Sequence, residues 1–165
     1  GAAWYSPLAL FGLIVWLIPM GQFLLPLITT HRLVIWQPHG ATTPLACAVI
    51  GLLILLLSGG AHSLGWLSAP PTTQAFIPLF LLPLVTGASS HLLPLWMTQA
   101  QQRDRELQLR ILLGRHSAGR SALFMLGGLL ILAEQGWGLL LILVGLLHYI
   151  ILAVMAFFYK TPQKL

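Results

Sequence analysis

Histidines are the side chains in this sequence that could ligate a metal or a haem, and there are six of them. His91 and His148 lie in apolar stretches that we expect inside the hydrocarbon layer, where ionisable residues are costly and are functional candidates by default. Each follows a glycine by about one helical turn, Gly87 and Gly145, which leaves room for a flat ring or a close backbone. The specific interpretation is haem b ligated through imidazole. The alternative, which we favour, is hydrogen bonding to a neighbouring helix.

Depth argues against one haem shared by both residues. His148 is central in its predicted span, whereas His91 is offset toward the cytoplasmic side by about 7 Å at the helical rise. A kink at Pro94 would reduce this offset. His62, in the segment GGAHSLGWL, is a third candidate ligand near the outer surface. The histidine spacings match neither HxH nor HExxH, so the sequence does not identify a bound metal. It also contains no catalytic triad, phosphate loop or paired carboxylates. We therefore expect no catalytic activity of the chain's own.

The composition identifies the elements that must position these residues. Hydrophobic residues make up 58% of the sequence and charged residues 7%, whereas about a quarter of a soluble domain is charged. The chain is therefore predicted to be an integral membrane protein, and the apolar stretches do not alternate as barrel strands would. Its eight Lys and Arg against three Asp and Glu are explained by the positive-inside rule rather than by nucleic-acid binding.

The predicted fold is an all-α transmembrane bundle that forms one domain over residues 1–165. Five spans are expected, at about 7–29, 43–61, 74–97, 121–134 and 137–159, since about 20 apolar residues cross a bilayer. With five spans, all eight Lys and Arg fall on one side of the membrane. This places the C-terminus in the cytoplasm and the N-terminus outside, most simply at a bacterial inner membrane. Four spans with a re-entrant fourth segment are the alternative.

Residues 98–120 are predicted to form a basic cytoplasmic loop, part of it an interfacial helix with Leu107 and Ile111 on one face and a Glu106–Arg110 pair. The loop contains Arg103, Arg105, Arg110, Arg115 and Arg120. Close helix packing is assigned to Gly87, Gly127, Gly128 and Gly145.

Two segments resemble a known superfamily. AHSLGWL (61–67) and PLVTGASSHLLPLW (83–96) are similar to stretches of the haem-copper-oxidase-like polytopic proteins, which include the nitric-oxide-response membrane proteins. The resemblance implies a redox or gas-response role and places only His62 and His91 on the family's motifs. The family has more spans and several ligand histidines, and this chain lacks the paired histidines of a binuclear centre.

Three functions follow from these observations. The favoured one is an accessory or structural subunit of a larger inner-membrane complex, for which a respiratory or redox complex is one candidate. Its partners are the lipid bilayer and other membrane subunits. The alternative is a haem-binding protein of redox or gas-response type. A small transporter is disfavoured because the sequence shows neither a buried carboxylate nor a positively charged substrate site.

Overall fold

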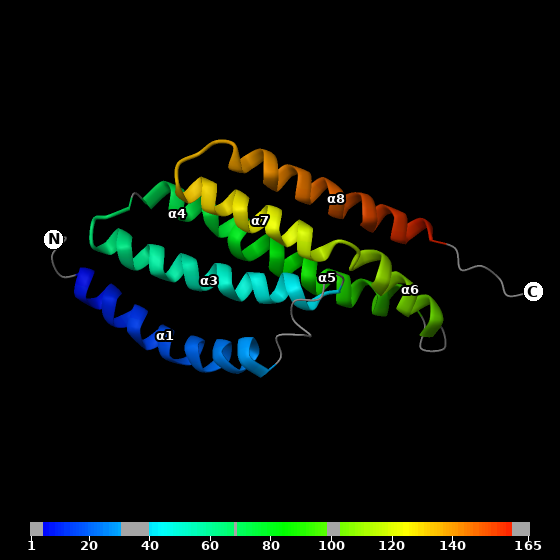
Figure 1. The fold of residues 1–165 in the computed structure, drawn as a ribbon, viewed down its shortest axis with the longest axis horizontal. Helices are drawn as coiled ribbons and strands as arrows, with labels where there is room; N and C mark the ends of the chain where they lie inside the picture. Colours follow the sequence, from blue (N-terminus) through cyan, green and yellow to red (C-terminus); the bar gives the residue numbers. More distant parts are fainter. Residues whose placement is uncertain (1–4, 31–39, 68, 99–102, 160–165) are drawn as a thin grey trace, which may run out of the picture.

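The computed structural model describes residues 5–30, 40–67, 69–98 and 103–159, and every regular element in these ranges is helical. The elements are α1 (Tyr5–Thr30), α3 (Thr42–Ser63), α4 (Ala69–Phe76), the π-helix η2 (Ile77–Leu81), α5 (Leu82–Met97), α6 (Arg103–Leu113), α7 (Ser117–Leu132) and α8 (Gly138–Phe158). Figure 1 shows an elongated bundle whose helices run close to its long axis. The prediction of an all-α fold is confirmed for the described residues.

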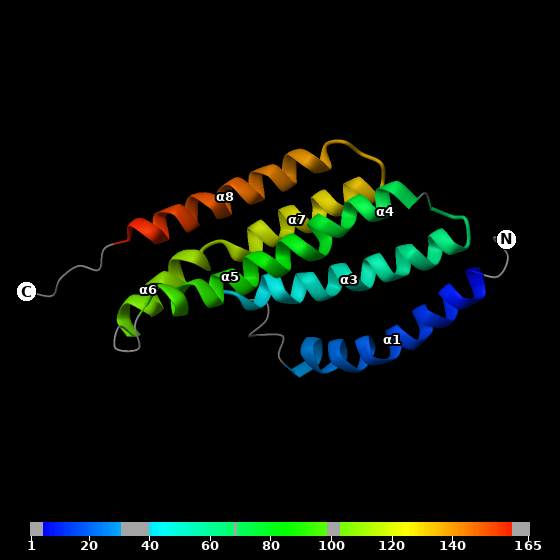
Figure 2. The ribbon, with the colours of Figure 1, turned by 180° about the vertical axis from the view of Figure 1, so that it is seen from behind.

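The described helices make five passes along this axis. In these passes α4, η2 and α5 follow one another as one long rod, and α7 leads on from α6 (Figures 1 and 2). Helix α3 packs on α1, on the α4–η2–α5 rod and on α7, whereas α8 packs on α7 and α6. The extensive contact of α1 is with α3. The bundle is therefore centred on α3, η2, α5 and α7.

Three helices in the described part are long and apolar enough to cross a membrane: Thr42–Ser63, Pro70–Met97 and Gly138–Phe158. They coincide with the predicted spans 43–61, 74–97 and 137–159, although the second begins earlier than predicted. The predicted spans 7–29 and 121–134 correspond to α1 and α7, of which α1 contains a shorter apolar stretch, Leu10–Pro26, and α7 has 16 residues.

The π-helix brings the backbone of Leu79 into the centre of the bundle. In η2 the N–H of Leu82 donates to the carbonyl of Ile77, and Pro83, which follows, has no N–H to donate to the carbonyl of Leu79. That carbonyl lies against Gly51 of α3, and the Leu79 side chain lies against Gly128 of α7. Leu79 is fully buried. Gly51 and Gly128 therefore allow α3 and α7 to pack closely on η2, where Pro83 leaves the Leu79 carbonyl without its helical donor.

The predicted basic loop contains a helix that packs on the bundle. Leu109 and Leu113 of α6 are fully buried and form a cluster with Leu152 and Ala156 of α8. These two leucines are four residues apart and so share one helical face. The expected apolar face, Leu107 and Ile111, instead points outward, with 59% and 62% exposure. Helix α6 therefore extends the bundle beside the end of α8.

Candidate functional site

The glycines assigned to helix packing lie where helices approach most closely. A Cβ atom on Gly127 would be 2.8 Å from the carbonyl oxygen of Gly138 on α8, and one on Gly145 would be 2.8 Å from the Phe124 ring. A Cβ atom on Gly87 would be 3.0 Å from Leu45 of α3. Gly128 meets Leu79, as described above. The close α7–α8 contact at Gly127 and Gly145 accompanies the placement of Arg120 of α7 beside Tyr149 of α8.

These polar residues surround an interruption between α6 and α7. Helix α6 ends at Leu113, and His116 adopts a left-handed conformation (φ 53°) before α7 begins at Ser117. The carbonyl of Gly114 accepts hydrogen bonds from the N–H groups of Gly40 (3.0 Å) and Ser117 (3.3 Å). The interruption is thus tied to Gly40, two residues before α3, and a Cβ atom on Gly114 would be 2.9 Å from the backbone of Gly40.

Arg120 lies inside the bundle beside this interruption. Its side chain is 2% exposed, and Nη2 donates to the Leu113 carbonyl at 3.4 Å, a carbonyl that also accepts from Ser90 Oγ at 3.4 Å. The last carbonyls of a helix lack intrahelical donors, and a cation near them is favourable. The guanidinium also lies over the Tyr149 ring, 4.8 Å from its centroid. Arg120 therefore links α6, α7 and α8.

Several buried donors at this position have no acceptor among the described residues. They are Nε and Nη1 of Arg120 and the hydroxyl of Tyr149. Buried polar groups are nearly always hydrogen-bonded, by protein or by ordered water. The chemistry of this cluster is that of hydrogen-bond donors around one fixed positive charge, which suits a water molecule or an anion.

Two imidazoles meet at the same level of the bundle. The rings of His116 and His148 are 6.0 Å apart between centroids and are arranged edge to face. His148 is half-buried on α8. Because His116 belongs to the α6–α7 turn, this contact places the turn beside the His148 ring.

The other candidate ligands lie elsewhere. His91 is exposed on α5, a helix that shares no extensive contact with α8, so the structure does not bring His91 together with His148. His62 is exposed at the end of α3, and its Nδ1 is 2.7 Å from the carbonyl of Leu67. This contact joins the last turn of α3 to the segment that follows it. In the ranges that the structure describes, no group of three or more His, Cys, Asp or Glu could hold a metal ion.

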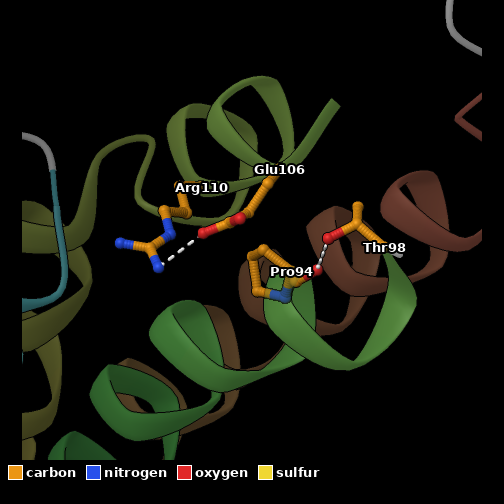
Figure 3. Close-up of polar contacts among 4 residues, drawn as sticks. All are labelled: Pro94, Thr98, Glu106 and Arg110. Carbon is orange, nitrogen blue, oxygen red and sulfur yellow. Dashed lines mark hydrogen bonds and ion pairs between the residues drawn. The ribbon is translucent and has the colours of Figure 1, made fainter. Parts of the chain in front are cut away.

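The five arginines predicted to lie in one loop occupy different environments. Arg103 and Arg115 are exposed, and Arg105 is half-buried. Arg110 pairs with Glu106 at 2.7 Å, which confirms that predicted ion pair (Figure 3). The same view shows the end of α5, where the Thr98 hydroxyl donates to the carbonyl of Pro94 at 2.7 Å. Arg120 differs from the other four because it belongs to α7 and is buried.

Sequence reasoning missed the burial of Arg120 and the contact between His116 and His148. A signal for the first was present, because Arg120 shares helical spacing with Phe124, Gly127 and Ile131, all buried on one face of α7. The second required knowing which turn lies beside α8. Arg120 also places a positive charge inside the bundle.

Comparisons of this chain with protein families, with curated proteins and with solved structures return no match.

Proposed function

We propose that this protein is an accessory subunit of a larger complex in a bacterial inner membrane and has no catalytic activity of its own. In this proposal the five helical passes cross the bilayer with the N-terminus outside and the C-terminus in the cytoplasm. In the sequence every Lys and Arg falls within or directly beside the connections on one side of the five passes, with Arg120 in the first turn of α7. This segregation supports the orientation. The three long apolar helices support insertion into the membrane.

The observation that carries the proposal is the surface formed by α1 and α3. Gly12 and Gly21 on α1 and Gly59 on α3 have no atom within 4 Å of the position of a Cβ atom. A groove of about 450 Å³ is lined by Gly12 and Gly59 together with Trp16 and Phe76. Transmembrane helices associate through small residues that let their backbones approach closely. A transmembrane helix of a partner subunit fits this surface.

Helix α1 is also the least integrated of the described helices. It packs on α3, where the Leu13 side chain meets Gly60, whereas α3 and α7 each contact several other elements. Because lipid tails are as apolar as leucine, close packing rather than apolarity drives helix association in a membrane. The open glycines are therefore the informative feature, and the exposed apolar side chains alone are not.

The test is recovery of partners with position-specific variants. The tagged chain is expressed in its own host and purified in mild detergent, and membrane proteins that co-purify are identified by mass spectrometry. Gly12→Leu and Gly59→Leu fill the α1–α3 surface, and Gly119→Leu is the control because Gly119 is an equally open helical glycine on α7. A photoreactive residue at position 16 reports proximity.

We expect one membrane protein to be lost with Gly12→Leu and Gly59→Leu, to be retained with Gly119→Leu, and to crosslink at position 16. Circular dichroism establishes that each variant is still helical. Equal recovery of every membrane protein with all three variants contradicts the proposal.

Haem binding is the second candidate, and the contact between His116 and His148 is the observation that favours it. An imidazole is a common axial ligand of haem iron. A reduced-minus-oxidised spectrum of the purified chain tests this function. If haem b is bound here, its band is lost in His148→Leu and in His116→Leu and is retained in His91→Leu. A colourless wild-type chain excludes this candidate.

A further inference from the structure

A groove beside α6 combines basic and apolar side chains. Its volume is about 860 Å³, and it lies between α6, the α6–α7 turn, Gly40 and the residue that follows α8. The lining residues that matter for its chemistry are Arg110, Ile111, Leu112, Arg115, His116 and Tyr159. Among the described residues that line it, none is acidic.

Two arginines line this groove, and Arg115 carries its uncompensated positive charge because Arg110 is paired with Glu106. Arg115 is exposed, so its guanidinium is free to turn toward a ligand. Arg110 uses Nη2 to hold Glu106, and its Nε is buried without an acceptor among the described residues (Figure 3). An anion with several oxygen atoms would give acceptors to both guanidinium groups. The groove therefore fits a phosphate group.

The groove also has apolar walls, which a free phosphate ion would leave uncovered. Ile111 is 62% exposed, and Leu112 is half-buried beside it. The Tyr159 hydroxyl donates to Oε1 of Gln108 at 2.9 Å, which holds the tyrosine across the gap between α8 and α6. Tyrosine is enriched at the level of lipid headgroups, and basic pockets between helices on the cytoplasmic side bind acidic headgroups.

We propose that this groove binds one anionic phospholipid, with its phosphate between Arg110 and Arg115 and an acyl chain along Ile111 and Leu112. The inference uses the cytoplasmic orientation given above, and it does not depend on a partner subunit. A zwitterionic lipid has the same phosphate but adds a positive charge next to the arginines. The groove therefore selects for net negative charge as well as for a phosphate.

Native mass spectrometry of the full chain tests this proposal. Phosphatidylglycerol is added to the delipidated protein in detergent, and phosphatidylcholine and inorganic phosphate are added in parallel titrations. Arg115→Gln removes a lining charge. Arg103→Gln is the matched control because Arg103, at the start of α6, is an exposed arginine like Arg115 but does not line the groove. Ile111→Ser changes the apolar wall without altering the charge.

Phosphatidylglycerol should bind the wild-type chain at least five-fold more tightly than phosphatidylcholine. Arg115→Gln should weaken this binding about five-fold, which corresponds to about 1 kcal/mol for one basic residue near an anionic lipid surface. Arg103→Gln should have little effect, and Ile111→Ser should also weaken binding. Two results overturn the proposal: equal affinities in the Arg115→Gln and Arg103→Gln variants, or displacement of the lipid by inorganic phosphate at millimolar concentration.

Discussion

Two glycines of α3 should respond in opposite directions to the same substitution. Gly51 lies against the Leu79 backbone in η2, whereas Gly59, two turns further along α3, faces open space. Gly51→Ala and Gly59→Ala both add one methyl group to one helix. The difference between them therefore isolates the close approach of α3 to the π-helix.

The magnitude follows from the geometry at Leu79. A Cβ atom on Gly51 would overlap the Leu79 carbonyl oxygen and lie 2.5 Å from its carbonyl carbon, whereas ordinary contact begins at 3.4 Å. The backbones must therefore separate by at least the difference, about 0.9 Å. Overpacking of this kind costs about 1–3 kcal/mol, because it also weakens the neighbouring dispersion contacts. Replacement of a helical glycine by alanine returns about 0.5–1 kcal/mol at either position.

We therefore expect Gly51→Ala to lower the free energy of unfolding by up to about 2.5 kcal/mol, and Gly59→Ala to raise it by about 0.5–1 kcal/mol. The assay is reversible unfolding in mixed micelles with an increasing fraction of SDS, followed by far-UV circular dichroism. Equal shifts for the two variants, or a more stable Gly51→Ala protein, would refute the close contact between Gly51 and Leu79.

The remaining predictions concern the buried arginine and the orientation in the membrane. Tyr149→Phe keeps the ring that faces Arg120 and loses only a hydroxyl without a described acceptor, so the unfolding free energy should change little. Tyr149→Leu removes the cation–π contact and should cost about 0.5–2 kcal/mol in the same assay; equal effects of the two variants would contradict this role. In a Cys47→Ala background, Gly136→Cys should react with an impermeant maleimide in intact cells, and Asp104→Cys should react only after permeabilisation. The opposite pattern would invert the proposed topology.

Arg120 is the side chain that most changes the interpretation of this protein. A basic residue at the end of a charged segment suggests solvent or lipid headgroups, yet this guanidinium is 2% exposed. It lies between the end of α6 and the Tyr149 ring. The same cluster joins three helices, so it is a structural element in the accessory-subunit proposal.

The sequence by itself determined the helical class and the positions of the long apolar helices. Residues 43–61 and 137–159 were predicted within two residues of α3 and α8 at each end, because turn-forming residues bound uninterrupted apolar runs there. The pair Glu106–Arg110 was also predictable, since four residues separate neighbours on one helical face. These features depend on local order along the chain.

Only the tertiary structure decided which charged and polar residues lie inside. The sequence placed Arg120 in a basic loop. It offered His91 as the only histidine that could share a haem with His148, and their predicted depths in the membrane argued against that pair. The packing of α7 on α8 instead buries Arg120 against Tyr149 and sets His148 beside His116. These outcomes depend on helix registry, which glycines such as Gly127 and Gly145 fix by letting two backbones approach. Such contacts join residues far apart in the sequence, and a periodic pattern within one segment carries no information about its neighbour.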